Sequence, residues 1–497
     1  MFVAVENLKA RVLKATRAES DWLHNYLSFP DAKAAFRSSR IPAWKRGDGK
    51  IHMLEQVSQT FPAGFIDIVV ASAAKDGHRV EVVDKRVKPA ADPRALLDWL
   101  RPYQTDAVAA AKKHERGIFH HVTGAGKTEV MVALAEVYPV RWLVLTHKLD
   151  LIAQTAKRFG SRTGEEVGKI GEGSRDLTKR ITISTFQSIV AALRSPDKRV
   201  KAAMQKHMLS IQGIMVDEAH VVGSDLFWKV TMSTPNAYFR YGFSATPFAR
   251  GDKRSVFIWG ALGPIIHRVA AEQLIALGVL AKPTIRMLSI KHQAVKRGGT
   301  WSEAESELIV HSKARNALVL QAASVATKPC LLFVRTIEHG RLLEKLLAAS
   351  GTKTEFAWGN KSTAQRQAAI RRLVHGDTDV LVCNVIFQEG IDIPELQSVV
   401  VAQGGKSTIA ALQRVGRGMR RHASNGDVTK TEFTVFDIKD AGCGCTSERK
   451  HASCKWMEQH SRDRVRAYGR EKYLVVDGLV GANLATSAKR SAVLPMV

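Results

Sequence analysis

The sequence predicts an α/β fold with two parallel-sheet lobes, and three observations lead to that prediction. Short apolar strands alternate with helical patterns between about residues 96 and 445, as they do in parallel sheets. One strand, residues 118–121, runs through a glycine-rich turn into a helical pattern. Another, residues 214–216, ends in two adjacent carboxylates. Because ligands bind at the carboxyl ends of parallel strands, these two ends predict a functional site.

Length and composition narrow the classes of function. The 497 residues suffice for about three domains with sizeable cores. Lysine and arginine number 74 against 47 acidic residues, a formal net charge of +27 with a pI near 10.0. We therefore expect a polyanionic partner, with nucleic acid ahead of an acidic membrane surface.

The sequence also indicates where the protein works. No apolar run reaches the ~20 residues of a membrane span, and the N-terminus lacks the apolar segment of a signal peptide. We expect a cytoplasmic protein whose five cysteines are reduced thiols.

Residues 1–95 are predicted to form a small α+β domain. A strand-like segment ends near Ala15, and Thr16 to Glu19 is a capping-box signature for a short helix. Further strands are expected at residues 65–71 and 80–83. Residues 87–93 contain two prolines and are predicted to be a linker.

The same domain carries cations interleaved with aromatic residues, an arrangement typical of nucleic-acid surfaces. The alternative is a solvated basic face over core aromatics. Both interpretations stay open for Phe36, Arg37, Arg40, Trp44, Lys45, Arg46 and Lys50.

The glycine-rich turn predicts a phosphate-binding loop. Small residues let backbone N–H groups close around a polyphosphate, and the following helix adds its positive N-terminal end. Lys127 would reach the β- and γ-phosphates, and the Thr128 hydroxyl would hold Mg²⁺. The strict motif has glycine where this chain has His121. The predicted loop comprises Thr123, Gly124, Ala125, Gly126, Lys127 and Thr128.

Three further segments of residues 96–270 are candidates for the same site. Gln104 would read an adenine edge, or would merely begin a helix. Asp217 suits the water shell of Mg²⁺, and Glu218 suits orienting or deprotonating the water that attacks the γ-phosphate. Ser244 and Thr246 end another strand and would relay the γ-phosphate state by hydrogen bonding.

Residues 271–445 repeat the alternation in a second lobe, with buried strands at 329–335 and 379–384 flanking a helix at 337–349. Near the end of this lobe, Arg417 and Arg420 are three residues apart, so a helix would point both guanidinium groups the same way. Such a pair suits the charge that develops on a γ-phosphate, as an arginine finger does. The alternative is a basic helix face on nucleic-acid phosphates.

Six ordered segments together resemble the motifs of superfamily 2 helicases and translocases. They are Leu-Arg-Pro-Tyr-Gln (100–104), Thr-Gly-Ala-Gly-Lys-Thr (123–128), Asp-Glu-Ala-His (217–220), Ser-Ala-Thr (244–246), Gln-Glu-Gly-Ile-Asp-Ile-Pro (388–394) and Gln-Arg-Val-Gly-Arg-Gly-Met-Arg (413–420). The resemblance covers about residues 96–445 and implies two RecA-like lobes with ATP between them.

The resemblance also implies roles for individual residues. It places Arg101 and Gln104 near the adenine, and it gives His220, Ser244 and Thr246 the coupling of the lobes. The second lobe would complete the ATP site with Gly390, Asp392, Gln413, Arg417 and Arg420. Contacts to the nucleic-acid backbone would come from Thr146, His147, Lys148, Ser184, Thr185, Arg335 and Asn384.

Within the superfamily, the first motif and the lobe spacing resemble the branch that holds type III restriction subunits, XPB-type helicases and phage UvsW-type branched-DNA helicases. Residues 44–54 and 61–65 resemble the N-terminal domain of the UvsW type. The resemblance implies an ATP-dependent DNA helicase or translocase that remodels forks, junctions, R-loops or D-loops in recombination, repair or replication.

Two alternatives are a restriction motor subunit translocating on duplex DNA and a non-enzymatic nucleic-acid-binding scaffold. The lack of an obvious Pro-Asp…Asp/Glu-x-Lys nuclease pattern counts against the first, and the intact motif residues count against the second. We expect ATP and Mg²⁺ as cofactors and DNA as the partner, with RNA as another substrate. We further expect a monomer that works with a single-strand-binding or recombination protein, in the host cytoplasm if a phage encodes it.

Residues 446–497 are predicted to form a basic helix over 454–473 and a frayed tail from 482. The helix carries Arg462, Arg464, Arg466 and Arg470, which would cover the second lobe or touch DNA. Cys443, Cys445 and Cys454 with His451 are a candidate zinc set, although Cys-x-Cys is not the spacing of a zinc finger.

Overall fold

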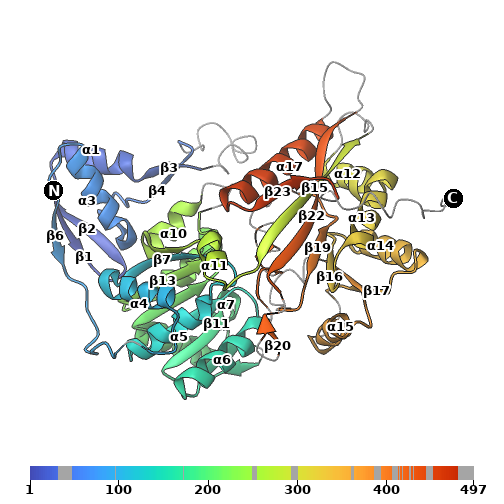
Figure 1. Cartoon of the computed structure of the whole chain (residues 1–497). Helices are drawn as coiled ribbons and strands as arrows, with labels where there is room; N and C mark the ends of the chain where they lie inside the picture. The colour runs from blue at the N-terminus through green and yellow to red at the C-terminus, as the bar shows by residue number, and fades with distance from the viewer. Residues whose placement is uncertain are drawn as a thin grey trace. The chain divides into compact units, whose positions relative to one another are not determined.

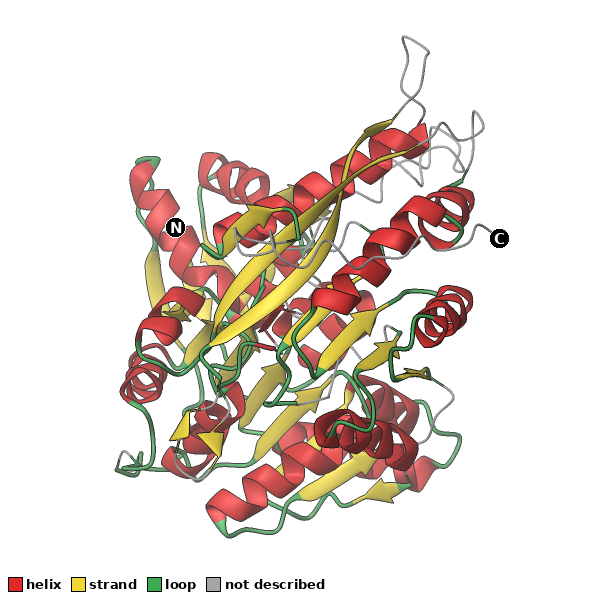
Figure 2. Ribbon diagram, turned by 45° about the vertical axis from the view of Figure 1, so that its right-hand side comes forward, coloured by secondary structure: helices red, strands yellow, loops and turns green. Residues whose placement is uncertain are grey.

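Figures 1 and 2 show the chain in a computed structural model. The structure describes residues 1–31, 48–95, 97–171, 173–248, 254–292, 300–359, 363–384, 393–405, 412, 415–416, 418–421, 423–424, 427–428, 430–443 and 452–479. The chain divides into two compact units, Met1–Val269 and Ala270–Val497. Within the described ranges, no helix has the length and apolar character needed to cross a membrane.

The first unit begins with a small sheet in the order β5-β2-β1-β6. β1 and β2 are antiparallel neighbours, whereas β6 returns parallel to β1. The predicted capping box is confirmed: the Thr16 hydroxyl accepts from the Glu19 N–H while the Glu19 carboxylate accepts from the Thr16 N–H. The elements are β1 Phe2–Val5, β2 Lys9–Lys14, α1 Arg17–Tyr26, β3 Ser28–Pro30, β4 Lys50–His52, β5 Thr60–Pro62, η2 Ala63–Phe65, α3 Ile66–Lys75 and β6 Glu81–Asp84.

The strand expected at residues 65–71 is wrong, because the chain forms η2 and then α3 there. Its β-branched residues favoured a strand. However, Phe65, Val69 and Ala73 recur every four residues and are all buried in the core of this region. Burial of one helical face outweighs the weak intrinsic preference for a strand. The basic and aromatic residues between 36 and 46 lie outside the described residues.

The rest of the first unit is an eight-stranded sheet in the order β10-β9-β11-β8-β12-β13-β7-β14, parallel throughout except between β10 and β9. Its central strands at 142–146 and 213–217 are nearly continuous apolar runs, as expected for strands covered by helices on both faces. One core packs against α4, α5 and α6, and the other against α7, α8 and α10. The helices are α4 Pro102–His114, α5 Lys127–Val137, α6 Asp150–Thr163, α7 Phe186–Leu193, α8 Lys198–Ser210, η3 Ala219–Gly223, α9 Asp225–Thr231 and α10 Ser255–Leu262.

The strand order positions the candidate site. β13 lies between β12 and β7, so the carboxyl ends of these three strands are neighbours. The phosphate loop, the Asp217-Glu218 pair and the Ser-Ala-Thr segment therefore meet at one edge of the sheet. The strands are β7 Arg116–His121, β8 Trp142–Thr146, β9 Gly168–Gly171, β10 Ser174–Arg175, β11 Ile181–Thr185, β12 Gly213–Asp217, β13 Phe239–Ser244 and β14 Ile265–Val269.

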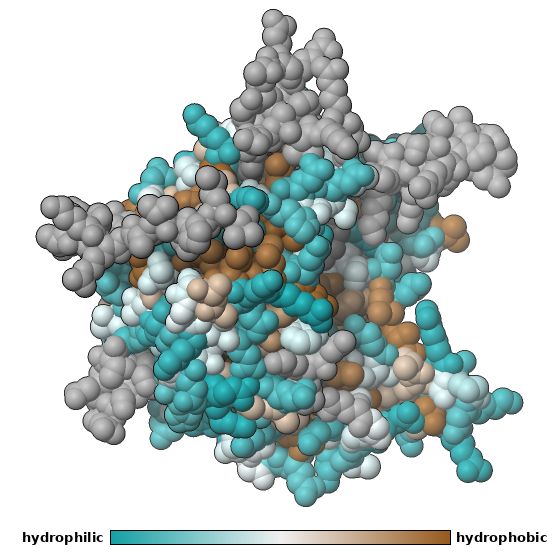
Figure 3. All heavy atoms as spheres, turned by 90° about the vertical axis from the view of Figure 1, so that its right-hand side faces the viewer, coloured by the Kyte–Doolittle hydropathy of each residue, from teal (hydrophilic) through white to brown (hydrophobic). Residues whose placement is uncertain are grey.

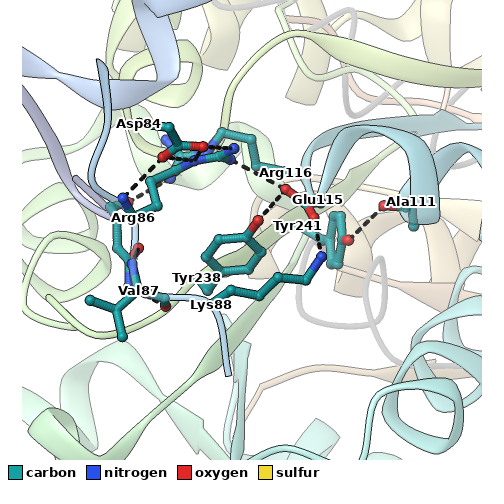
Figure 4. Close-up of polar contacts among 10 residues, drawn as sticks. Asp84, Arg86, Val87, Lys88, Ala111, Glu115, Arg116, Tyr238 and Tyr241 are labelled. Atoms are coloured by element: carbon teal, nitrogen blue, oxygen red, sulfur yellow. Dashed lines mark hydrogen bonds and ion pairs between the residues drawn. The ribbon is translucent and has the colours of Figure 1, made fainter. Parts of the chain in front are cut away.

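The predicted linker forms no helix or strand, and the segment that leads into it is tied to the eight-stranded sheet by polar contacts (Figure 4). Glu115, just after α4, accepts hydrogen bonds from Lys88 Nζ at 2.9 Å and from the Tyr238 hydroxyl. Arg86 pairs with Asp84 at 2.7 Å and lies 3.4 Å from Glu115. Arg86 and Lys88 are therefore held close to Glu115, the residue just before β7 (Figure 4).

The second unit is built on a seven-stranded, wholly parallel sheet in the order β17-β18-β16-β19-β22-β15-β23. Together with the first unit's sheet it confirms the predicted fold of two parallel-sheet lobes. Its strands are β15 Lys282–His292, β16 Cys330–Phe333, β17 Thr354–Ala357, β18 Val380–Cys383, β19 Ser398–Val401, β22 Glu432–Cys443 and β23 Leu474–Asp477, with a separate pair β20 Ala423–Ser424 and β21 Asp427–Val428.

Helices cover this second sheet as well. α13 and α14 share one core with alternate residues of the central strands, and α17 runs against β22 (Figure 1). The helices are α11 Ala271–Ala276, α12 Trp301–Glu305, the π-helical turn η4 Ser306–Val310, α13 Lys313–Val325, α14 Ile337–Ala349, α15 Thr363–His375 and α17 Ala452–Arg470.

The predicted C-terminal helix is α17, but the chain then adds β23, a strand that the sequence analysis did not predict. β23 pairs in parallel with β15 from Thr284 to Met287. Arg464, one of the four arginines expected to cover the second lobe or to touch DNA, is 1% exposed and pairs with Asp437 inside the second unit. Hydrophilic residues predominate over the described part of the face in Figure 3, in keeping with a chain that is 24% charged.

Buried ion pairs hold α17 to the sheet. The Arg464 guanidinium donates to both carboxylate oxygens of Asp437, at 2.9 and 3.1 Å. The Tyr468 hydroxyl donates to the same carboxylate at 2.8 Å. Asp440 accepts from Arg315 of α13 at 2.7 Å and from Ser461 of α17 at 2.8 Å. The C-terminal helix and strand are thus part of the second unit's fold.

Candidate active site

The phosphate loop joins β7 to α5 with backbone conformations that require glycine. Gly124 has φ 87° and Gly126 has φ 74°, both in the left-handed region that side chains disfavour. The loop turns there so that α5 begins at Lys127, with its first N–H groups unpaired by the helix. This geometry suits an anion-binding cradle, and phosphate binding by these residues stays a prediction.

His121 stands where the strict motif has glycine, and the structure explains why a histidine fits. It is still within β7, opposite Val269 of β14, and the left-handed turn comes only later at Gly124. Its ring is fully buried and its Nε2 lies 2.9 Å from Nδ1 of His267. Burial lowers the pKa of His121 to about 3, with a further contribution from His267.

Gln104 is packed against the loop. Its Nε2 donates to the Ala125 carbonyl at 3.3 Å, and its Oε1 accepts from the Arg101 N–H at 3.1 Å, which caps α4. A Cβ at Gly126 would come within 2.5 Å of Gln104 Nε2. Gln104 therefore lies in the first turn of its helix and also contacts the phosphate loop, and its reading of an adenine edge stays a prediction.

Asp217 and Glu218 end β12 as predicted. Glu218 adopts a left-handed conformation, φ 50° and ψ 54°, which is strained for a residue with a side chain and is typical of functional turns. The turn brings its Oε1 within 3.6 Å of Lys127 Nζ. The Asp217 carboxylate accepts the Glu218 N–H at 3.0 Å.

The two carboxylates differ in electrostatics. Burial raises the pKa of Asp217, and the neighbouring Glu218 charge raises it further. Burial acts the same way on Glu218, but Lys127 and then His220 outweigh it, so the pKa of Glu218 is lowered. Glu218 is therefore the firmly ionised member of the pair, whereas Lys127 and His147 oppose the rise in the pKa of Asp217 without cancelling it.

The predicted coupling residues form a chain of contacts from the carboxylates to β13. His220 Nδ1 lies 3.3 Å from Glu218 Oε2 and 3.2 Å from the Ser244 hydroxyl. The Ser244 hydroxyl also accepts the Thr246 N–H at 3.1 Å. The structure thus brings Lys127, Glu218, His220, Ser244 and Thr246 together.

The predicted nucleic-acid contacts of the first unit are placed at strand ends with their hydroxyls already engaged. Thr146 donates to the Lys148 carbonyl at 3.2 Å, Ser184 to the Ile170 carbonyl at 3.1 Å, and Thr185 caps α7 by accepting the Ser188 N–H. His147 and Lys148 follow Thr146 and are partly exposed. Direct nucleic-acid contact by these residues stays a prediction.

In the second unit, several predicted residues lie outside the described residues: Gly390, Asp392, Gln413 and Arg417. Arg420 is described and forms an isolated bridge with Leu280, and burial lowers its pKa. Asn384 is 8% exposed at the end of β18. Arg335 follows β16 and is paired with both carboxylate oxygens of Glu305.

The structure describes only part of the candidate zinc set. Cys454 is buried in α17, whereas Cys445 and His451 lie outside the described residues. Within the described ranges, no three histidine, cysteine or acidic side chains cluster as a metal site would require. Metal binding by this set stays untested.

Two residues that contact predicted site residues or segments were not themselves predicted from the sequence. His120 of β7 contacts the Ser-Ala-Thr segment, and Glu305 holds Arg335. The signal for the first was present, because two histidines at the end of an otherwise apolar strand are unusual. The signal for Glu305 was absent, because it depends on a fold between residues 30 apart.

Two family models match the chain. The model described as type III restriction enzyme, res subunit, matches residues 98–249, and the helicase conserved C-terminal domain matches residues 313–422. The first match holds the phosphate loop and the Asp-Glu-Ala-His segment, and the second reaches Arg420.

The chain is also similar to a DNA helicase and to a DNA translocase, in keeping with the two matched domains. The ATP-dependent DNA helicase uvsW of Enterobacteria phage T4 is 26% identical over 396 residues, which are 75% of this chain and 75% of that protein. The DNA 3'-5' translocase XPB2 of Sulfurisphaera tokodaii is 25% identical over 367 residues, 65% of this chain and 79% of the relative.

A solved structure shares the fold: the fragment of a putative HsdR subunit of a type I restriction enzyme from Vibrio vulnificus YJ016. It has 20% identity and a TM-score of 0.52, covering 69% of this chain and 65% of that one. The phosphate loop, the acidic pair and the two matched domains identify the chain as an ATP-dependent superfamily 2 helicase that resembles the UvsW type.

Proposed function

We propose that this helicase remodels branched DNA, such as forks, junctions, R-loops and D-loops, by ATP-driven movement along one strand. The contact between Lys127 and Glu218, 3.6 Å apart across the left-handed turn of Glu218, carries the chemical part of the proposal. DNA as the substrate is supported by the phage T4 relative, an ATP-dependent DNA helicase. The branched form of the substrate is supported by the resemblance of the N-terminal segment to the UvsW type.

The residues of the first unit suggest how ATP is hydrolysed. The N–H groups of the phosphate loop bind the polyphosphate, and the Lys127 ammonium moves onto its outer oxygens. That movement takes the positive charge away from Glu218. Because Lys127 is the strongest influence lowering the pKa of Glu218, the carboxylate becomes a better acceptor for the attacking water. Glu218 thus orients the water only once phosphate is bound.

Mg²⁺ fits the oxygen donors beside this loop. The Asp217 carboxylate is partly buried and has a raised pKa that Lys127 and His147 do not cancel, and the Thr128 hydroxyl is in the first turn of α5. Hard oxygen ligands are the ones Mg²⁺ prefers, usually one or two carboxylates with phosphates. When bound, the ion would neutralise charge on the phosphate oxygens. Asp217 would ionise fully beside it, since a cation opposes the burial that raises its pKa.

The second lobe would complete the site through residues that stay predictions. We assign the γ-phosphate contacts to Gln413, Arg417 and Arg420, and interlobe contacts to Gly390 and Asp392. Closing of the lobes on ATP and reopening after hydrolysis would move the backbone contacts along the strand. We divide the chain accordingly into residues 1–95, 96–270, 271–445 and 446–497.

The nucleic-acid partner follows from charge. A net charge of +27 favours phosphate binding without distinguishing DNA from RNA. We assign the sensing of DNA structure to the N-terminal domain. We propose that the protein acts as a monomer in the cytoplasm, with a single-strand-binding or recombination protein as its accessory partner.

The decisive experiment is steady-state ATP hydrolysis at fixed low salt with no nucleic acid, single strands, blunt duplex, a fork, a four-way junction or RNA. We expect the fork or junction to stimulate hydrolysis most. Lys127→Ala should abolish the stimulated rate with every substrate, which excludes a contaminating ATPase. Equal rates with single strands and junctions would refute the branched-DNA proposal.

A second candidate is a duplex translocase that serves a restriction system. The matched res-subunit model and the HsdR-like fold favour it. Blunt duplex that stimulates hydrolysis as strongly as a fork, together with a length-dependent rate, would select this candidate. Metal-dependent cleavage of plasmid by the purified chain would strengthen it.

A further inference from the structure

His120 contacts the segment that the sequence assigned to coupling. It is the last but one residue of β7 and pairs in register with Ser244 of β13. Its Nε2 lies 2.9 Å from the carbonyl oxygen of Ala245. A carbonyl oxygen only accepts, so Nε2 carries the hydrogen and the ring is in one defined tautomer.

This contact closes a loop of interactions through the site. From Lys127 the contacts run to Glu218 at 3.6 Å, to His220 at 3.3 Å and to Ser244 at 3.2 Å. The next residue, Ala245, is held by His120, and β7 leads from His120 straight back to the phosphate loop. The Ser-Ala-Thr segment is therefore fixed from two sides, by the Asp-Glu-Ala-His turn and by the strand that carries the phosphate loop.

The ring of His120 is suited to a fixed, uncharged role. Burial lowers its pKa to about 4, with a further contribution from Arg268, so it is neutral at physiological pH. Within the part of the chain that the structure describes, its buried Nδ1 has no hydrogen-bond partner. A charged ring would also repel Lys127, which a neutral donor does not.

The segment held in this way carries an unused polar group. The Thr246 hydroxyl oxygen is buried and, across the described ranges, has no hydrogen-bond partner. The Thr246 N–H, by contrast, donates to the Ser244 hydroxyl. The position of this hydroxyl thus depends on what fixes the backbone at Ala245.

We propose that His120 is a positioning residue that couples the phosphate loop to the Ser-Ala-Thr segment, so that a phosphate-driven shift in one moves the other. Through the Ala245 carbonyl, His120 sets where the Thr246 hydroxyl lies and transmits the state of the nucleotide away from the site. The inference rests on the ATP hydrolysis of this chain and adds a residue that none of its motifs includes.

Two substitutions at position 120 separate this role from simple packing. His120→Leu keeps a similar volume and removes the donor, whereas His120→Gln keeps an amide N–H that can reach the carbonyl. Tyr241→Phe is the matched control. It removes another buried hydrogen bond from a side chain to a carbonyl, 3.0 Å long, on the same strand pair but directed at Ala111.

The first measurement is hydrogen–deuterium exchange over residues 241–248 with and without a non-hydrolysable ATP analogue. Wild type, His120→Gln and Tyr241→Phe should all gain protection on nucleotide binding. In His120→Leu, the protection factor gained on nucleotide binding should be roughly fivefold smaller than in wild type, because this is the net contribution of one hydrogen bond. Equal protection in His120→Leu and wild type would overturn the proposal.

The second measurement is the number of base pairs unwound or translocated per ATP, with KM for ATP measured in parallel. His120→Leu should lower this ratio while KM changes little, and His120→Gln should restore it. A loss that Tyr241→Phe reproduces, or that His120→Gln fails to rescue in a folded protein, would contradict the coupling role. If wild type shows no DNA-stimulated hydrolysis, the proposed function fails, and the exchange experiment alone still decides the role of His120.

Discussion

Each of the two large sheets carries a pair of acidic residues. The two pairs differ in how many hydrogen-bond donors their carboxylates engage. In the second unit, Asp437 accepts from Arg464, from Tyr468 and from the Ile438 N–H, so every part of the carboxylate is occupied. In the first unit, Asp217 is only partly buried, and within the described ranges its carboxylate accepts one hydrogen bond, from the Glu218 N–H. The two carboxylates thus differ both in burial and in the number of donors that they engage.

The difference separates buried carboxylates that stabilise the fold from carboxylates that can bind a ligand or take part in a reaction. A buried carboxylate with a full set of donors cannot take up a ligand without losing those bonds, so it serves the fold. A partly buried carboxylate with spare acceptor capacity and a raised pKa is poised to gain a partner. The comparison assigns chemistry to the edge of the first sheet and cohesion to the α17 side of the second.

The largest expected effect comes from Glu218→Gln. The amide keeps the shape of the carboxylate, but it cannot accept a proton from the attacking water. The kcat for DNA-stimulated hydrolysis should therefore fall about 10²- to 10⁴-fold. The melting temperature should stay near that of wild type, because no saturated pair is broken. A variant that hydrolyses ATP at the wild-type rate would remove Glu218 from the mechanism.

Arg464→Met should mainly lower the stability of the protein, whereas Glu218→Gln should mainly lower its activity. Losing the guanidinium leaves Asp437 buried without its cation, which should cost about 3–5 kcal/mol of unfolding free energy. Denaturant titration of the full chain measures this. The double variant Asp437→Leu with Arg464→Met should recover most of the loss, since an apolar pair of similar volume needs no charge. Equal instability of single and double variants would show that the pair is not the cause.

Buried neutral histidines should make both units sensitive to acid. Burial lowers the pKa of His339 to about 3, from an ordinary value of 6.5. Between these values the unfolded chain binds a proton that the folded chain does not, so stability falls as pH falls below about 6.5. The slope should be up to about 1.4 kcal/mol per pH unit for one such histidine.

The variant His339→Gln tests this slope, because glutamine can still donate to Asn316, which now receives a 2.9 Å bond from the ring. Unfolding free energy measured from pH 7 to pH 4 should decline less steeply in the variant. His375→Gln, at an exposed histidine of α15, is the matched control. An unchanged slope in His339→Gln would exclude this histidine as a source of acid sensitivity.

The smallest effect is expected for Lys472→Ala. Its ammonium pairs with Glu272 at 2.7 Å, but the two side chains are 70% and 61% exposed. Water screens such pairs, so the unfolding free energy should change by less than about 1 kcal/mol. A loss as large as that of Arg464→Met would break the distinction between buried and exposed pairs on which the comparison depends.

The sequence predicted which residues meet at one edge of the first sheet, because the reasoning is local. Asp217 is the last residue of β12, Glu218 follows it, and Lys127 begins the helix after β7, while parallel strands end on the same side of a sheet. The catalytic roles of these residues stay predictions. The role of His120 was out of reach, because the Ala245 carbonyl is 125 residues away and meets it only through the register of β7 and β13. Local pattern does not encode such a register.

Other differences have the same origin. α3 was expected as a strand because β-branched residues outweighed its spacing of buried positions. Arg464 looked like one more cation of a basic helix, since the sequence does not say which face of α17 meets β22. β23 is only four residues long and follows a helix, so its pairing with β15 could not be inferred without the sheet.

The position of β23 at the end of the seven-stranded order has a practical consequence for anyone shortening this protein. Truncation after α17 would strip β15 of its neighbour along residues Thr284 to Met287 and leave that row of N–H and C=O groups facing solvent. A bare edge of this kind templates strand addition from another molecule, and its exposed groups promote self-association. β23 therefore protects the protein against aggregation by pairing with β15. A soluble shortened version of the chain must retain residues up to at least Asp477.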